Sequence, residues 1–226
     1  MFHGHINQAD PLKIQLDKGV HKIVGDQYGC MNVTCSHITL VGKGKTQTTV
    51  RGGFLVFNKQ NVTFEELAVT NPRARGTGLY LRGSETNVDV VKCTVKKCGG
   101  TGMSVVRGAT ATATQCEFTE SGNGVFCYRA NTTARLNDCK IHHNAWYGLK
   151  ACHAVVDLYG TKTDIHSNKS RGIWATDRGK VNIHLPAQHN TSHDNVRSNR
   201  YQHSGGSIAN HNADGTFTHA VVDDGL

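Results

Sequence analysis

Proline and helix-forming patterns are both scarce in this sequence. Only 3 of the 226 residues are proline, whereas 25 are glycine, and many turns without proline favour short strands joined by compact corners. No long stretch keeps an apolar period of 3.6 residues behind a capping residue, which argues against long helices. No run approaches the roughly 18 apolar residues that a membrane-spanning helix needs, so no membrane span is expected.

Dense blocks of positive charge are also missing, although the chain carries a formal net charge of +8. The closest approach is Lys92, Lys96 and Lys97, which are interleaved with strand residues, so nucleic acid is not an expected partner. A basic surface otherwise favours acidic partners such as uronate polysaccharides or acidic peptides, or it simply keeps the protein soluble.

The eight cysteines include no Cys-x-x-Cys pair, so a structural zinc site is not expected. Cys93, Cys116 and Cys139 recur at steps of 23 residues, which predicts a column of reduced thiols facing the interior, where free cysteine behaves as a small hydrophobe. Residues 1–5 lack the charged and apolar regions of a secretory signal. Unpaired interior cysteines slightly favour an intracellular location, so the compartment stays open. Three other cysteines lie near turns and could pair if the protein is secreted: Cys30, Cys35 and Cys98.

A repeat of about 24 residues defines the architecture. Each unit consists of a glycine, an alternating strand, a turn, a second alternating strand and another turn. A period of two inside such a repeat gives each strand one inward face, which only the stacking of coils can bury. The sequence therefore predicts an all-β, single-domain parallel β-helix of about nine coils. The glycines that open the units recur at steps of 25, 24, 22, 24 and 24 residues: Gly53, Gly78, Gly102, Gly124, Gly148 and Gly172.

Two segments carry a family resemblance. Residues 141–149 (IHHNAWYGL) and 165–173 (IHSNKSRGI) share isoleucine, asparagine and glycine at matching positions. This pattern resembles the right-handed parallel β-helix repeats of the pectin-lyase-like superfamily, especially its carbohydrate-binding and sugar-hydrolase repeats. The resemblance extends over residues 14–195 and implies a right-handed solenoid. It leaves the function open, because lyases, epimerases, hydrolases and non-enzymatic modules share that fold.

Three regions are expected within one domain of residues 1–226. Residues 11–52 would form the opening coils and residues 53–184 the regular repeats. The spacing breaks after Gly172, so residues 185–226 would contain an irregular loop and then a C-terminal coil or cap. A parallel solenoid needs such a cap to cover its open end.

Asparagine and histidine recur at the corners of the predicted coils. Asn144, Asn168 and, less regularly, Asn195 predict a buried ladder in which each amide bonds the turn backbone above and below it. Among the fourteen histidines, His142 and His166 lie one coil apart and could stack outward, which makes a metal site geometrically possible. Solvated turn histidines explain the pattern better, so no metal site is predicted.

Outward positions of the glycine-opened strands form two columns that could bind a ligand. Aromatic rings with interleaved cations can stack sugar rings and hold carboxylates, or grip an extended acidic peptide. The alternative is that these aromatic residues only reflect β-propensity. One column reads Tyr80, Ser104, Phe126, Lys150 and Trp174. The next reads Arg82, Val106, Tyr128, Cys152 and Thr176, with Arg107, Arg129 and His153 just beyond. The predicted ligand-binding residues are Tyr80, Arg82, Arg107, Phe126, Tyr128, Lys150 and Trp174.

Catalysis is the alternative to binding. The resemblance implies that a uronate lyase or epimerase would need a base for the C5 proton and a cation or Ca²⁺ for the developing carboxylate charge. The epimerase-type Asp-Pro-His-Asp motif is absent, however, and the acidic residues are scattered singly rather than paired as hydrolases require. No aspartate cluster on this face would hold Ca²⁺, so Ca²⁺ is expected only if the protein is a lyase. The candidate catalytic residues lie on adjacent coils: Tyr128, Arg129, Lys150 and His153.

The first functional hypothesis is therefore a non-catalytic recognition module without a cofactor. Its basic, aromatic-bearing face would bind an acidic polysaccharide or a protein partner. A polysaccharide lyase or epimerase is the second hypothesis and a purely structural spacer the third. The sequence leaves the oligomeric state open.

Overall fold

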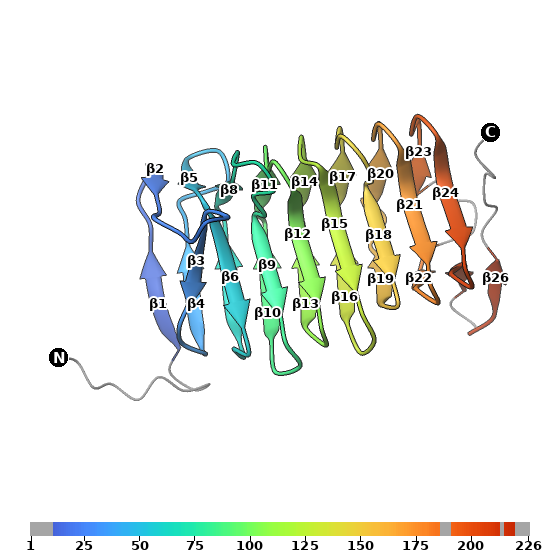
Figure 1. Cartoon of the computed structure of the whole chain (residues 1–226), viewed down its shortest axis with the longest axis horizontal. Helices are drawn as coiled ribbons and strands as arrows, with labels where there is room; N and C mark the ends of the chain where they lie inside the picture. Colours follow the sequence, from blue (N-terminus) through green and yellow to red (C-terminus); the bar gives the residue numbers. More distant parts are fainter. Residues whose placement is uncertain (1–10, 186–190, 213–214, 220–226) are drawn as a thin grey trace.

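The computed structural model describes residues 11–185, 191–212 and 215–219, and the regular elements in these ranges are all β-strands. None of the described residues belongs to a helix long and apolar enough to cross a membrane. Figure 1 shows short strands that wind around one long axis, with β1 (Leu12–Gln15) and β26 (Phe217–His219) at opposite ends of the row. The predicted all-β parallel solenoid is confirmed.

Three long sheets run along the axis, and each coil contributes one strand to each of them. Sheet A contains, in spatial order, β1 (Leu12–Gln15), β4 (Ile38–Val41), β7 (Val62–Glu65), β10 (Asn87–Val91), β13 (Thr110–Thr114), β16 (Thr133–Asn137), β19 (Val155–Tyr159), β22 (Lys180–Ile183), β25 (Ser207–His211) and β26 (Phe217–His219). Sheet B contains β2 (Gly19–Lys22), β5 (Thr48–Arg51), β8 (Ala68–Thr70), β11 (Thr94–Lys96), β14 (Glu117–Thr119), β17 (Lys140–His142), β20 (Asp164–His166) and β23 (Ser192–His193). Sheet C contains β3 (Cys30–Val33), β6 (Gly53–Phe57), β9 (Leu79–Arg82), β12 (Thr101–Val106), β15 (Asn123–Tyr128), β18 (Leu149–Cys152), β21 (Arg171–Thr176) and β24 (Ser198–His203).

Each coil has three strands, so the prediction of two strands per coil was wrong. The glycine-opened strands form sheet C and the cysteine-led strands form sheet B, whereas the strands of sheet A were not recognised. In one coil β10 ends at Val91 and β11 begins at Thr94, and the backbone turns between them at Lys92, whose φ is 51°. A corner this short contains no glycine or proline to mark it. Eight coils of three strands are described, and β25 begins a ninth, which agrees with the predicted number.

Left-handed backbone positions form columns at the corners. The residues that follow successive strands of sheet C include Arg107, Arg129, His153 and Asp177, with φ values of 58°, 81°, 53° and 49°. A non-glycine residue in this region is strained by about 1–2 kcal/mol. The paired coils on both sides hold each corner in register, so the same strained turn recurs from coil to coil.

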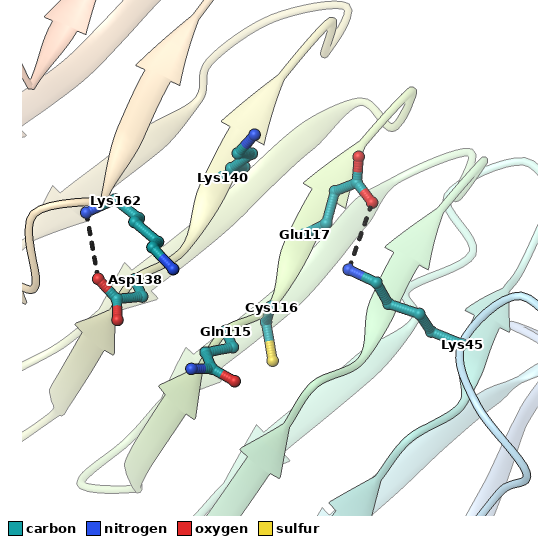
Figure 2. Close-up of a pocket in the computed structure, with 7 residues that line it drawn as sticks. All are labelled: Lys45, Gln115, Cys116, Glu117, Asp138, Lys140 and Lys162. Atoms are coloured by element: carbon teal, nitrogen blue, oxygen red, sulfur yellow. Dashed lines mark hydrogen bonds and ion pairs between the residues drawn. The ribbon is translucent and has the colours of Figure 1, made fainter.

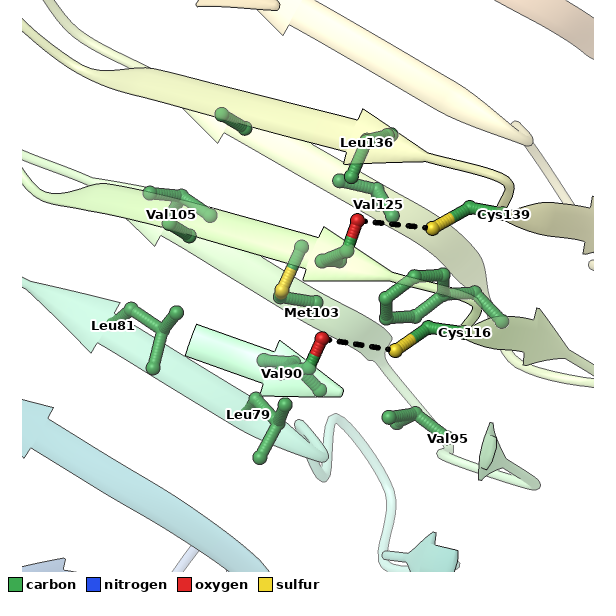
Figure 3. Packing of buried hydrophobic residues seen from close by; sticks show 14 of the residues in the cluster. Leu79, Leu81, Val90, Val95, Met103, Val105, Cys116, Val125, Leu136 and Cys139 are labelled. Atoms are coloured by element: carbon green, nitrogen blue, oxygen red, sulfur yellow. Dashed lines mark hydrogen bonds between the residues drawn. The ribbon is translucent and has the colours of Figure 1, made fainter. Parts of the chain in front are cut away.

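Buried apolar side chains fill the space between the three sheets, and the cysteine column is part of this core (Figure 3). Cys93, Cys116 and Cys139 are all buried. The Sγ atoms of Cys116 and Cys139 donate hydrogen bonds to the carbonyl oxygens of Val90 and Ala113 at 3.2 and 3.3 Å. All eight cysteines are free, including Cys30, Cys35 and Cys98. The prediction of reduced interior thiols is confirmed for the column.

The predicted asparagine ladder is also confirmed. The backbone N and side-chain Nδ2 of Asn144 donate to Asn168 Oδ1 at 3.1 and 2.9 Å. The same two groups of Asn168 donate to Asn195 Oδ1 at 3.0 and 2.9 Å. Each amide thereby forms hydrogen bonds with backbone groups at the corner between sheets B and C, where strand pairing does not provide them.

The two ends of the core differ. At the N-terminal end, Leu12, Ile14 and Val20 are exposed. At the other end, the inward register positions beside Ile173 and Ala175 are occupied by Arg200 and Gln202, which are polar. The last described strand, β26, pairs antiparallel with β25, so it ends the parallel stacking of sheet A.

The region predicted as an irregular loop and cap is described only in part. Residues 186–190, 213–214 and 220–226 lie outside the described residues, as do residues 1–10, which include the start examined for a secretory signal. Within residues 185–204, β24 pairs in parallel with β21 and continues sheet C by one more coil. The regular coils therefore extend beyond residue 184.

Candidate functional site

The outward column predicted on the glycine-opened strands is present in sheet C. Lys150 lies beside Phe126 on one neighbouring strand and beside Trp174 on the other. Tyr80 precedes them in the same column, beside Ser104. From Tyr80 onward the column extends past its predicted end to one more aromatic residue and reads Tyr80, Ser104, Phe126, Lys150, Trp174 and Tyr201. Before Tyr80 the same register continues through Leu55 and Asn32.

The ammonium group of Lys150 is surrounded by aromatic rings. Its Nζ lies 3.7 Å from the centroid of the Trp174 ring, and 5.6 and 5.7 Å from those of Tyr147 and Phe126. Tyr147 and Trp174 contact each other edge to face, with centroids 4.7 Å apart. A cation over an aromatic face is stabilised by the ring quadrupole, so the rings hold Lys150 in place on the sheet.

Arg171 precedes Gly172 as Tyr147 precedes Gly148, so it occupies the position of Tyr147 one coil further along. Its Cζ lies 3.9 Å from the centroid of Tyr201 and 4.9 Å from that of Trp174. Cations and rings thus alternate over neighbouring coils. We call this surface the cation–aromatic face and define it by six residues: Phe126, Tyr147, Lys150, Arg171, Trp174 and Tyr201.

The cation–aromatic face has unmatched hydrogen-bond donors and positive charge. None of the ion pairs among the described residues involves Lys150 or Arg171. Arg171 Nε and Trp174 Nε1 are buried without a hydrogen-bond partner in the described structure. Burial lowers the pKa of Lys150, although the negative charge of the Asp177 carboxylate opposes this shift. The rings therefore hold cations that form no ion pair with a carboxylate in the described structure.

The second predicted column forms smaller groups around the cation–aromatic face. Tyr128 stacks on Phe126 with centroids 5.9 Å apart, and Arg129 lies over Tyr128 at 5.2 Å. Two coils towards the N-terminus from Tyr128, Arg82 lies over the ring of Phe57 at 5.3 Å.

Arg107 follows β12 and is exposed at the corner. The predicted ligand-binding residues therefore share sheet C and its edge, and the closest ring–cation contacts concentrate around Lys150 and Arg171.

The four candidate catalytic residues divide into three groups. Tyr128 and Arg129 contact each other, Lys150 lies among the rings, and His153 Nδ1 lies 3.6 Å from Cys152 Sγ. A backbone hydrogen bond connects Arg129 N to the carbonyl oxygen of Cys152 at 3.0 Å, but no side-chain hydrogen bond among the described residues connects one of these groups to another. A shared proton-transfer site would require a substrate to join them.

Tyr147 and Arg171 were missed by the analysis of the sequence, and the reason is local. Counting back from Lys150 with a period of two places Gly148 outward and Tyr147 inward. A Cβ on Gly148 would lie 2.7 Å from both Asn168 Nδ2 and Ile165 Cγ2, so Gly148 and the following leucine both face inward. The alternation of inward and outward side chains restarts at each such glycine. The residue before the glycine, Tyr147 or Arg171, therefore faces outward.

A separate basic depression lies along the corner between sheets A and B (Figure 2). Its volume is about 360 Å³. Lys45 Nζ lies 4.0 Å from Glu117 Oε2, and Asp138 Oδ1 accepts a hydrogen bond from the backbone N of Lys162 at 3.1 Å. Lys45 forms an ion pair here, in contrast to Lys150 of the cation–aromatic face. The lining residues are Lys45, Gln115, Cys116, Glu117, Asp138, Lys140 and Lys162.

Histidines form a third surface feature on sheet B. The rings of His142, His166 and His193 stack with centroids 5.0 and 5.3 Å apart and interplanar angles of 7° and 8°. The predicted outward stacking of His142 and His166 is confirmed. His193 is held on both sides, by Asp194 Oδ2 at 2.8 Å and by Asp164 Oδ1 at 3.0 Å.

This stack is expected to make stability depend on pH in two opposing ways. Burial and the charges of neighbouring histidines lower the pKa of His166, whereas the hydrogen bond to Asp194 raises the pKa of His193. Acidification below about pH 6.5 therefore removes stability through His166, since the unfolded chain binds that proton more tightly. Stability from His193 is fully present below that pH and is lost as the pH rises through its folded-state pKa.

Urea unfolding of two variants at about pH 7.5 and pH 5 checks this expectation. His166→Asn should reduce the loss of stability on acidification, and His193→Asn should increase it. Equal losses in the wild type and both variants would show that the stacked imidazoles do not differ in their folded-state proton affinity.

Comparison with known proteins supports the solenoid and its handedness. A family model described as "Right handed beta helix region" matches residues 29–196. Among solved structures, the chain is similar to ORF18 of Geobacillus virus E2, with a TM-score of 0.55 and 12% identity, covering 92% of this chain and 55% of that one. This chain thus spans about half the length of that protein, and the likeness shows the fold alone. No curated protein is matched.

Proposed function

The chain belongs to the right-handed β-helix family, and on this scaffold we propose that it is a non-catalytic recognition module whose cation–aromatic face binds an acidic polysaccharide. The observation that carries the proposal is the environment of Lys150 and Arg171. Both cations are held by aromatic rings, at 3.7 Å from Trp174 and 3.9 Å from Tyr201, and neither forms an ion pair within the described ranges. A carboxylate or sulfate of a ligand would supply the missing negative charge.

The rings and cations of the cation–aromatic face recur from coil to coil along the solenoid axis, as sugar units recur along a polysaccharide chain. Neighbouring strands of a sheet lie about 4.8 Å apart, and the column from Phe126 to Tyr201 crosses four consecutive strands of sheet C. An extended chain of acidic sugars lying along the axis would meet a ring or a cation at each step. Sugar rings pack on aromatic faces, while their carboxylates bind the cations between them.

A polysaccharide fits this face better than an acidic peptide. Peptides that bind to sheets gain most of their affinity by adding a strand at an open edge. β15, β18 and β21 are each paired on both sides within sheet C, so their backbone groups are already bonded. A ligand can therefore contact only side chains on this face. Aromatic rings can stack against sugar rings, and the cations can bind their carboxylates.

Binding can be measured by co-sedimentation and calorimetry with pectate, alginate, hyaluronan and chondroitin sulfate, with and without Ca²⁺. We expect at least one of them to bind, with an affinity that falls as salt concentration rises. The double variant Lys150→Met, Arg171→Met should weaken binding by about 10- to 100-fold, since two charge-assisted contacts are lost. Ultraviolet absorbance in the same samples would reveal the unsaturated product of a lyase.

A matched control removes the same amount of charge elsewhere. The double variant Lys140→Met, Lys162→Met alters the basic depression in Figure 2 and should bind like the wild type. Equal weakening of binding by both double variants would show that the interaction depends on the net charge of the protein and not on the cation–aromatic face. Loss of binding in the control alone would show that the ligand binds at the basic depression. Formation of unsaturated product would show that the protein is a lyase and not a non-catalytic module.

A further inference from the structure

Three potential metal ligands meet at the edge of sheet C. Cys152 ends β18, His153 follows it, and Asp177 follows β21 on the next coil. One donor atom of each, a thiol sulfur, an imidazole nitrogen and a carboxylate oxygen, lies within 4.8 Å of the other two. Cys152 is buried, His153 is exposed and Asp177 is intermediate. The cluster therefore has a protected side and an open side.

From this geometry we propose that Cys152, His153 and Asp177 form a binding site for Zn²⁺. Cys152 Sγ lies 3.6 Å from His153 Nδ1 and 3.2 Å from Asp177 Oδ2. Zinc bonds of about 2.3 Å to sulfur and about 2.0 Å to nitrogen or oxygen place two ligand atoms about 3.5 Å apart in a tetrahedron. Both distances from the sulfur lie within a few tenths of an ångström of this value, and the imidazole and carboxylate atoms lie within 4.8 Å of each other.

The backbone at the corner explains why these side chains converge. Successive residues of an extended strand point to opposite faces of the sheet, which would separate Cys152 from His153. His153 has a φ of 53°, and this left-handed turn brings its ring to the same side as the thiol. Asp177 occupies the equivalent corner position one coil later, with a φ of 49°, so the stacking of coils aligns its carboxylate with the other two ligands.

The donor set selects the kind of metal. A thiolate and an imidazole suit zinc and other borderline ions, whereas Ca²⁺ and Mg²⁺ require oxygen ligands. On binding, the Cys152 thiol releases its proton to solvent, and the thiolate and the Asp177 carboxylate together balance the charge of a divalent ion. Thr176 Oγ1 donates a hydrogen bond to Asp177 Oδ2 at 3.2 Å, which orients that ligand from outside the coordination sphere. Three protein ligands leave a fourth position for water or a ligand oxygen.

A nucleophilic cysteine is a poorer interpretation of the same residues. In a cysteine–histidine–acid relay the carboxylate orients the histidine. Here Asp177 instead accepts a hydrogen bond from the Cys152 thiol. Burial and the Asp177 carboxylate together raise the pKa of Cys152 to about 11, so the free thiol is a weak nucleophile.

Cobalt titration tests the site because a thiolate ligand has its own spectroscopic signature. The purified, reduced protein is treated with a chelator and titrated with Co²⁺, which substitutes for Zn²⁺ in tetrahedral sites. We expect thiolate-to-cobalt charge-transfer absorption together with the visible bands of tetrahedral cobalt, and both should disappear when one equivalent of Zn²⁺ is added. Cys152→Ala should lose the charge-transfer absorption, and Asp177→Asn should weaken Co²⁺ binding at least tenfold.

Two controls separate this site from other thiols and histidines of the chain. Cys35→Ala removes a cysteine that is only partly buried, and His166→Asn removes the middle ring of the histidine stack; both variants should keep the full signal. The proposal is overturned if the wild type shows no charge-transfer absorption, if that absorption survives Cys152→Ala, or if only His166→Asn reduces binding. Asp177→Asn changes a partly exposed residue, so its result does not depend on whether Cys152→Ala folds well.

Discussion

Asn168→Ala is expected to lower the free energy of unfolding by about 3–5 kcal/mol, the largest effect of any substitution considered for this protein. Asn168 is fully buried. Its Oδ1 accepts hydrogen bonds from the backbone N and Nδ2 of Asn144, and its Nδ2 donates to the carbonyl of Ile141 at 3.2 Å. Alanine removes the partner of each of these groups and leaves them buried, and each unsatisfied group costs about 1–3 kcal/mol.

Denaturant unfolding followed by circular dichroism measures this effect, and Lys169→Ala is the matched control. Lys169 is the adjacent, exposed residue of the same turn, so its loss should change the midpoint little. Because each coil contacts only its neighbours, hydrogen exchange should rise most in the coils that contain Asn144 and Asn195. A midpoint for Asn168→Ala close to that of the control would mean that water replaces the amide and that the ladder adds little stability.

The sequence predicts the inward and outward columns of sheet C because two signals agree there. The spacing of the glycines gives the length of each coil, and the alternation after each glycine shows which side chains point into the core and which point outward. The sequence therefore places Lys150 between Phe126 and Trp174, and the pairing of β18 with its neighbours confirms that register. The cysteine column and the asparagine ladder were found in the same way, because buried small or amide side chains recur at one position of the repeat.

Features that depend on the shape of a corner were not predictable. The strands of sheet A were missed because the corner at Lys92 is left-handed without glycine. The contact between Cys152 and Asp177 joins residues 25 positions apart, and it depends on left-handed turns at two successive corners. Lys45 reaches the basic depression from a loop three coils away from Glu117, and no repeat relates those positions. Periodicity predicts which residues lie in one column, but it does not predict side-chain contacts across a turn.

The glycines that open the repeats provide the second large prediction. Gly148→Ala is expected to lower the free energy of unfolding by about 3 kcal/mol, at the upper end of the usual penalty for overpacking a core. The added Cβ would lie 2.7 Å from Asn168 Nδ2, 2.7 Å from Ile165 Cγ2 and 2.8 Å from the carbonyl oxygen of Gly172. All three belong to the next coil, and moving any of them would disturb either the ladder or the pairing of β18 with β21.

Gly205 is a control in which the reason for glycine is different. Its φ is 74°, and an added Cβ would meet no atom closer than 3.7 Å, so Gly205→Ala should cost about 1 kcal/mol through backbone strain alone. Asparagine tolerates the left-handed region, and Gly205→Asn should recover part of that loss, whereas Gly148→Asn should be at least as damaging as Gly148→Ala. Urea midpoints of the four variants distinguish the two causes. Recovery by asparagine at position 148 would show that backbone conformation, and not the space between coils, requires glycine at the start of each repeat.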